Sequence, residues 1–87
     1  MKITIDVTSD DIAGGKRLAC EKCPVALAVS RRVVGTASVS KFYISIDGFL
    51  VKQPPTVKSF IRDFDNQRTV KPFSFDLKLP AEIVRPV

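Results

Sequence analysis

The sequence contains no histidine, so it lacks the commonest general base of enzymes and the commonest metal-ligating side chain. Ser-His and Cys-His catalytic pairs are therefore excluded. The acids offer no replacement. Asp10 and Asp11 are adjacent and are typical of a helix start, and Asp63 and Asp65 cannot point the same way on one helix. We therefore expect a protein that is not an enzyme and that uses no cofactor.

The sequence also lacks any apolar run near the ~20 residues that span a bilayer. Its first residues, 1–6, alternate and include an acid, which is not typical of a signal peptide. We expect a cytoplasmic protein with reduced thiols and no membrane contact. A chain of 87 residues makes one domain, 1–87, with an ordered core over about residues 2–79 and a C-terminal tail over 80–87.

No block of five like charges and no internal repeat is present. Fourteen basic against nine acidic residues give a net charge of +5, which favours an anionic partner such as nucleic acid, a nucleoprotein or an acidic protein face. Solubility alone explains so modest a charge equally well. The residues that we predict to bind a partner are Lys16, Arg17, Lys22, Arg31, Arg32, Lys41, Tyr43, Lys52, Lys58 and Arg62.

The first half of the chain predicts a strand and a buried helix. Residues 2–7 alternate as a half-buried strand does, and residues 8–15 predict one short helical turn capped by Thr8 or Ser9. A helix is predicted from Pro24 to about Val33, with Cys23 at its N-cap. Because residues 25–29 are apolar nearly all round, we expect this helix to be buried.

The strongest local signal is Asp47-Gly48 between two runs rich in β-formers, residues 39–46 and 49–52. This dipeptide predicts a two-residue type I′ hairpin. The expected partners are Ile46 with Phe49, Ile44 with Val51, Ser45 with Leu50 and Tyr43 with Lys52, with Phe42 on the core face beside Ile44 and Ile46.

A second helix is predicted after Pro54-Pro55, capped by Thr56. Its apolar stripe is Val57, Phe60, Ile61 and Phe64, and Lys58 and Arg62 lie on its solvent side as a candidate contact ridge. Residues 72–79 alternate and predict the last strand.

This order predicts an α+β fold with a four-stranded antiparallel sheet and two helices on one face, in the β-α-β-β-α-β order of ferredoxin-like proteins. A plain α+β meander of the same elements is the alternative. The exposed edges of such a sheet also leave a homodimer open.

Cys20 and Cys23 admit three interpretations. As metal ligands they supply half of a tetrahedral zinc site, which a dimer sharing four thiolates would complete. As a redox pair they lie at a helix N-terminus, but Pro24 follows both cysteines instead of lying between them. The structural interpretation, which we favour, has Cys23 capping the helix and Cys20 filling a small apolar gap.

Direct nucleic-acid binding is a further alternative. In ferredoxin-like folds the open sheet face stacks bases on aromatic rings. Only Tyr43 would be available there, because all six phenylalanines fall on predicted core faces. Lys41, Tyr43 and Lys52 would still contact phosphate, and with Leu50 the same face would serve as a protein contact.

Three features carry a family resemblance: Asp11-Ile12 followed by glycine and a basic residue, Cys23-Pro24-Val25-Ala26-Leu27-Ala28, and Phe60-Ile61-x-x-Phe64-Asp65 with Pro72-Phe73-x-Phe75 beyond it. Over about residues 1–79 the chain resembles small, mostly uncharacterised proteins of bacteriophages and bacterial mobile elements. The resemblance implies a phage-type accessory protein in the cytoplasm of a bacterial host. It further implies binding to a host protein or nucleoprotein, for example a defence complex such as a CRISPR effector, and it assigns no catalytic residue.

Overall fold

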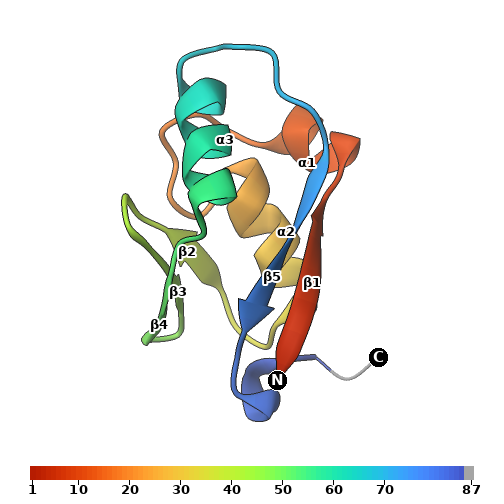
Figure 1. Cartoon of the computed structure of the whole chain (residues 1–87), viewed down its shortest axis with the longest axis vertical. Helices are drawn as coiled ribbons and strands as arrows, with labels where there is room; N and C mark the ends of the chain where they lie inside the picture. Colours follow the sequence, from red (N-terminus) through yellow and green to blue (C-terminus); the bar gives the residue numbers. More distant parts are fainter. Residues whose placement is uncertain (86–87) are drawn as a thin grey trace.

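The computed structural model describes residues 1–85 and shows an α+β fold (Figure 1). The last two residues of the predicted C-terminal tail, 86 and 87, lie outside the described residues. The elements in chain order are β1 (Lys2–Val7), α1 (Ser9–Gly14), α2 (Pro24–Arg32), β2 (Ala37–Val39), β3 (Tyr43–Ile46), β4 (Phe49–Lys52), α3 (Pro55–Asp65), β5 (Phe73–Lys78) and a 3-10 turn (Ala81–Ile83).

The predicted four-stranded sheet is wrong: residues 1–85 form two separate antiparallel sheets. β1 pairs only with β5, from Lys2–Lys78 to Val7–Phe73. The second sheet has the order β2-β3-β4. The ferredoxin-like arrangement is therefore excluded, and the residues expected on one open sheet face are divided between two sheets.

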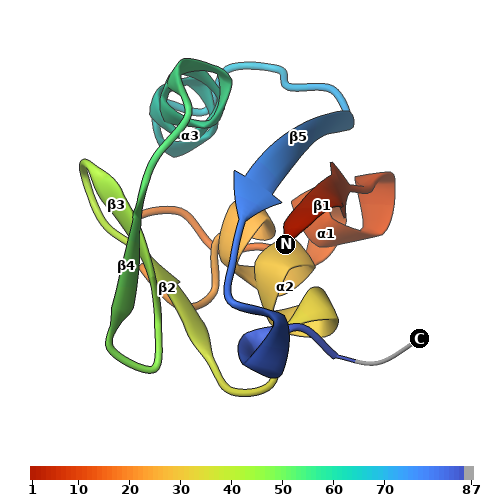
Figure 2. The ribbon, with the colours of Figure 1, turned by 60° about the horizontal axis from the view of Figure 1, so that its bottom comes forward.

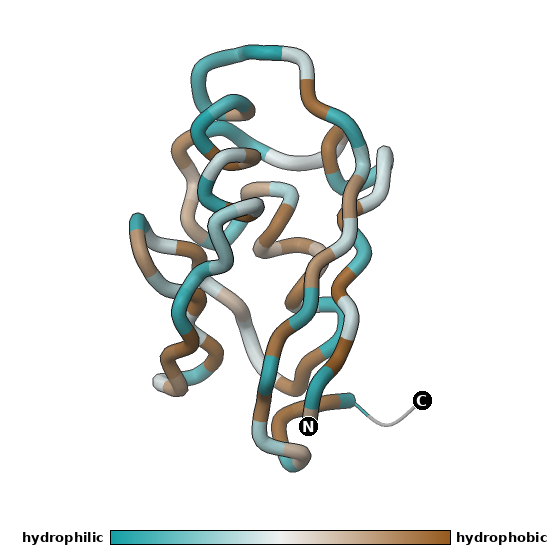
Figure 3. Tube along the Cα trace, viewed as in Figure 1, coloured by the Kyte–Doolittle hydropathy of each residue, from teal (hydrophilic) through white to brown (hydrophobic). Residues whose placement is uncertain are grey.

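The position of α2 explains why the strands do not merge. α2 lies between the β1–β5 pair and the three-stranded sheet (Figure 2). Its residues Val25, Ala26, Ala28 and Val29 are all fully buried, as the all-round apolar pattern predicted. A helix that is apolar all round has to be covered on more than one side, and a single sheet covers only one. Figure 3 shows hydrophobic residues along α2 and, alternating with hydrophilic ones, along β1 and β5.

The run of residues 39–46, predicted as one strand, is folded back on itself. Ser40 makes the turn, because its Oγ donates to the carbonyl of Tyr43 (3.1 Å) and accepts from the Tyr43 N–H (3.3 Å). β2 then pairs with β3, with Val39 opposite Ile44. Phe42 consequently lies in the turn and is 53% exposed, so its predicted place on the core face is wrong.

The predicted Asp47-Gly48 hairpin is confirmed, with all four expected strand pairs in register. Both turn residues have positive φ, 47° at Asp47 and 89° at Gly48, as a type I′ turn requires. Phe49 is nevertheless 38% exposed at the end of the hairpin. Two of the six phenylalanines thus lie outside the core.

The helix starts follow local chemistry. Thr8 caps α1 in a capping box with Asp11, and Cys23 caps α2 through a bond from the Ala26 N–H to its Sγ (3.4 Å). α3 starts two residues earlier than predicted, because Pro54 takes the N-cap position and Pro55 needs no hydrogen-bond acceptor in the first turn. Thr56 therefore lies inside the helix.

Residues beyond β5 return to the body of the protein. Val84 forms an isolated antiparallel bridge with Val33, and the Arg85 side chain donates to the Val33 carbonyl (2.7 Å). Within the described part of the chain, every helix is too short or too polar to cross a membrane.

Candidate functional site

The candidate site is a groove of about 630 Å³ between α3, the connection 15–23 and the turn that follows β2. Apolar side chains make most of its lining, and Lys41, Lys58 and Arg62 supply its positive charges. Cys20 and Cys23 also line it. The apolar lining residues are Leu18, Ala19, Val39, Pro55 and Ile61. A largely apolar groove that carries a few charged groups is the usual form of a binding site.

Asp65 attaches the connection 15–23 to α3. Its Oδ1 accepts from the Leu18 N–H (3.0 Å), and its carbonyl accepts from Nη1 of Arg17 (3.4 Å). Leu18 is held with a φ of +58°, a left-handed conformation that is uncommon for leucine, and its side chain is 80% exposed. An apolar side chain is therefore held out at the mouth of the groove.

Gln53 and Cys20 fix the opposite wall. The side chain of Gln53 is buried and its amide nitrogen donates to the Ser40 carbonyl (2.9 Å). The backbone N–H of Gln53 donates to the Phe42 carbonyl (2.9 Å). The Cys20 carbonyl accepts from the Val39 N–H (2.8 Å). These bonds place the turn that carries Lys41 beside α3.

The predicted ridge of Lys58 and Arg62 forms one wall of this groove. Both residues share a face of α3 with Ile61 and Asp65, since positions i, i+3, i+4 and i+7 lie on one side of a helix. Arg62 has one distant carboxylate partner, Asp63 at 3.8 Å, and that carboxylate also takes Arg68 at 3.0 Å. Among residues 1–85, Lys41 and Lys58 form no ion pair.

Phe42 lies next to the groove with its ring exposed. The ammonium group of Lys58 lies 4.9 Å from the ring centroid and that of Lys41 lies 5.5 Å away, both within cation–π range. The sequence pattern had assigned this ring to the core and left Tyr43 as the only aromatic residue able to stack. The structure therefore adds an aromatic residue to the basic surface.

The two cysteines differ in environment. Both are free thiols; Cys23 is buried and Cys20 is exposed, so the prediction that Cys20 fills an apolar gap is wrong. Burial raises the pKa of the Cys23 thiol, and the hydrogen bonds from the Ala26 and Val25 N–H groups only partly oppose that rise. A protonated, buried Cys23 is a poor nucleophile and a poor metal ligand.

Arg31 and Arg32 are separate from the groove and bind their own chain. Arg31 forms a two-bond pair with Asp11, Nη1 to Oδ1 at 2.8 Å and Nη2 to Oδ2 at 3.0 Å, and also donates to the Asp6 carbonyl (2.9 Å). Arg32 donates to the Thr4 carbonyl (2.7 Å). The Arg31 side chain holds the pKa of Asp11 below its usual value, and Asp11 in turn raises the pKa of Arg31.

The remaining predicted residues lie at the edges of this surface. Lys16 and Lys22 are exposed on the connection 15–23, where the Lys16 N–H donates to the Lys22 carbonyl (2.8 Å). Tyr43 and Lys52 are cross-strand partners on the outer face of the hairpin, beside the exposed Leu50. The structure thus brings Lys41, Lys58 and Arg62 together around the groove, places Arg17 against the Asp65 carbonyl, and leaves Arg31 and Arg32 apart.

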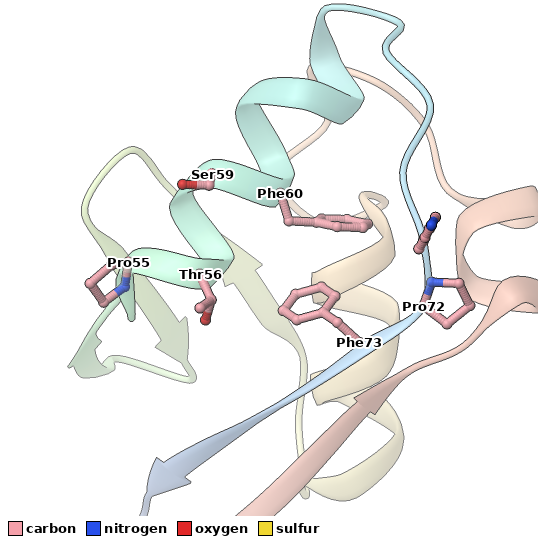
Figure 4. Close-up of a pocket in the computed structure, with 7 residues that line it drawn as sticks. Pro55, Thr56, Ser59, Phe60, Pro72 and Phe73 are labelled. Atoms are coloured by element: carbon pink, nitrogen blue, oxygen red, sulfur yellow. The ribbon is translucent and has the colours of Figure 1, made fainter.

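A second cavity, of about 470 Å³, lies between α3 and the start of β5 (Figure 4). Phe60 and Phe73 both line it and pack on each other, with ring centroids 4.7 Å apart. Of the residues that the structure describes, Lys71 is the only charged one that lines it, and the aromatic pair is part of the packing of α3 on β5. We therefore assign the candidate site to the groove with three cations.

Among the site residues that were not identified from the sequence, Leu18, Gln53 and Asp65 shape the groove. The position of Gln53 in the sequence gives the clearest hint of its role, because an amide side chain between a strand and Pro54 can fix a turn. Leu18 is a single apolar residue outside any periodic pattern, and Asp65 reads as an ordinary helix-end acid. Their roles depend on contacts between segments 47 and 13 residues apart in the chain.

Within residues 1–85, His, Cys, Asp and Glu form no cluster of three that could hold a metal ion. No family model, no curated protein and no solved structure matches the chain. The phage-type resemblance therefore stays a prediction, and function has to be argued from the groove itself.

Proposed function

We propose that this chain is a non-enzymatic binding protein that docks on a host protein or a nucleoprotein complex through the face that contains the groove. The observation that carries the proposal is the groove of about 630 Å³, with its apolar lining and with Lys41, Lys58 and Arg62 around it. Apolar area supplies affinity, and charges around it supply orientation and rate of association.

The charge of the groove face supports an acidic partner surface. The groove lining contains three cations and one carboxylate, Asp65, which is occupied by the Leu18 N–H. Uncompensated positive charge that surrounds an apolar site attracts an acidic partner and repels a basic one. The phage-type context is part of this proposal: the partner belongs to a bacterial host cell, and a defence complex such as a CRISPR effector is one candidate.

A pull-down from bacterial lysate tests the proposal. The immobilised chain should retain a specific partner at low salt, and retention should fall as salt rises because charges contribute to binding. The matched control is a chain with Lys41→Glu, Lys58→Glu and Arg62→Glu, which should retain less. Equal retention by both chains, or none by either at low salt, would contradict the proposal.

One observation favours direct nucleic-acid binding as a second candidate. Phe42 exposes its ring close to the ammonium groups of Lys41 and Lys58, and Tyr43, the next residue, is 46% exposed. Exposed rings flanked by cations bind single strands through base stacking and phosphate contacts. Stacking on an exposed aromatic ring contributes about 1–3 kcal/mol per base.

Fluorescence anisotropy with labelled single- and double-stranded DNA and RNA tests this candidate. Binding should favour single strands, should weaken steeply with salt, and should be lost in Phe42→Ala. Leu18→Gly is the matched control, because Leu18 lines the groove while Phe42 lies outside the lining. No binding at low salt would remove the candidate.

A further inference from the structure

We infer that the groove takes an acidic protein segment, in which one apolar side chain enters between Leu18 and Ile61 while flanking carboxylates pair with Lys41, Lys58 and Arg62. This inference rests on the proposed function and names the chemistry of the partner at that site. The arrangement joins two features that lie on different segments of the chain: an apolar interior and a set of cations around it.

The three cations of the groove are exposed and can reach a partner's carboxylates. Lys41 and Lys58 contact the Phe42 ring, and Arg62 shares the Asp63 carboxylate with the closer Arg68. Their remaining N–H groups face solvent, since all three side chains are exposed. Lys41 comes from the turn after β2, whereas Lys58 and Arg62 are one helical turn apart on α3. Carboxylates spaced along one segment can therefore reach both walls of the groove.

The interior of the groove is apolar. Val39 and Cys23 are buried and Ile61 is half-buried, so the floor of the groove is already mostly shielded from water. Leu18 projects at its mouth with 80% of its surface exposed, the highest fraction among the large hydrophobic residues that the structure describes. An apolar side chain inserted beside Leu18 would remove both surfaces from water, at about 25 cal/mol per Å² of apolar area.

Contacts with Asp65 hold Leu18 at the mouth of the groove. A leucine with φ near +58° is in a sparsely populated region, and it persists because surrounding contacts fix it. Those contacts are the bonds from the Leu18 N–H and the Arg17 side chain to Asp65. The groove therefore has its shape before a partner binds, which lowers the entropic cost of binding.

The apolar interior of the groove favours a protein segment over nucleic acid as its occupant. Phosphates would seek the cations but gain nothing from an interior made by Leu18, Val39 and Ile61. The ring that would stack a base, Phe42, lies outside the groove lining. A cavity of about 630 Å³ is within the usual range of ligand pockets, ~300–1,000 Å³, and accommodates a few side chains of one segment.

Selection of random 12-residue peptides on the immobilised full chain tests the inference. Recovered peptides should carry two or more Asp or Glu residues within four positions of a Leu, Ile, Phe or Met. In amide NMR spectra of the labelled chain, an added selected peptide should shift Ala19, Ser40, Ser59 and Ile61. Arg62→Glu should weaken the binding of that peptide at least tenfold, and Leu18→Gly should weaken it several-fold. Lys78→Glu, an exposed lysine on β5, should leave it unchanged.

The inference would be overturned if no peptide is enriched over a blank surface, if the enriched peptides lack acids, or if the shifts lie away from the groove. Shifts that appear on concentrating the chain alone would show a second copy in the groove, which also overturns it. The inference and the proposed function can fail separately: if the triple variant loses the lysate partner but no acidic peptide is enriched, the face docks a partner but the groove does not take an acidic segment. If peptides bind as expected while no lysate protein is retained, the chemistry of the groove holds and the docking proposal fails.

Discussion

Two sets of basic residues on this protein have opposite roles. Arg31 and Arg32, at the last turn of α2, direct their guanidinium groups at Asp11 and at carbonyls of β1. Around the groove, the ammonium groups of Lys41 and Lys58 and the guanidinium group of Arg62 face solvent, and the two ammonium groups lie near one exposed aromatic ring. The first set stabilises the fold, whereas the second set is available to a partner.

Net charge therefore does not by itself identify a binding surface. Arg31 and Arg32 count fully toward the +5, and both were predicted to bind a partner. Within residues 1–85, Arg31 donates three hydrogen bonds to its own chain and Arg32 donates one, so a partner would have to break the Asp11 pair to reach Arg31. Variants in either set of basic residues test this contrast.

The largest effect on stability should come from Arg31→Met. It leaves the buried Asp11 carboxylate without its two-bond partner and should lower the free energy of unfolding by about 2 kcal/mol, less than for a fully buried pair because Arg31 is half exposed. Arg62→Met is the matched control and should change it by less than about 0.5 kcal/mol. Urea denaturation measures both, and equal losses would contradict the comparison.

Acid should reduce the difference between wild type and Arg31→Met. The pKa of Asp11 is lowered in the folded state, so its contribution is present above its unfolded pKa, near 4, and is lost as pH falls through the lower folded pKa. Arg31 stays protonated throughout. Stability measured from pH 7 to pH 2 should show the two curves converge below about pH 4. Curves that stay parallel would mean that Asp11 is not the partner that matters.

The cysteines provide a smaller contrast within the groove itself. Cys23→Ala removes a buried side chain and the cap of α2 and should cost about 1 kcal/mol, whereas Cys20→Ala should be neutral. Iodoacetamide should alkylate the exposed Cys20 of the folded protein and spare Cys23, as mass spectrometry of peptides would show. A bound partner should slow the alkylation of Cys20. Rapid modification of Cys23 in the native state would contradict its assigned burial.

Leu18→Gly should also have only a small effect on stability. Glycine relieves the left-handed conformation at this position, but it also gives the unfolded chain more freedom, so the net change should stay within about 0.5 kcal/mol. Thermal unfolding measures it. A loss above 1 kcal/mol would mean that Leu18 stabilises the fold instead of contributing to the groove.

The sequence predicted local structure better than the arrangement of the strands. The alternation of β1, the cap and burial of α2, the stripe of α3 and the register of the Asp47-Gly48 hairpin are all set by near neighbours, and all are confirmed. The four-stranded sheet is wrong because Ser40 folds residues 39–46 back on themselves and because α2 needs cover on two sides. Both depend on contacts that periodicity does not report.

The candidate site shows the same division. Lys58 and Arg62 were identified as a ridge from their spacing, and the structure places them on the wall of the groove. The other wall depends on Gln53, which fixes the turn, and on Asp65, which attaches Leu18 to α3. Such long-range hydrogen bonds leave no pattern in one sequence, so the groove could not be predicted from it.

The most direct test measures two variants in the same two assays. Arg31→Met and the triple variant Lys41→Glu, Lys58→Glu and Arg62→Glu are each assayed for free energy of unfolding and for affinity toward one selected acidic peptide. The account predicts a crossover: Arg31→Met loses stability and keeps the affinity of the wild type, while the triple variant keeps its stability within about 1 kcal/mol and loses affinity at least a hundredfold. A triple variant that still binds as tightly as the wild type, or a folded Arg31→Met that does not bind, would contradict it.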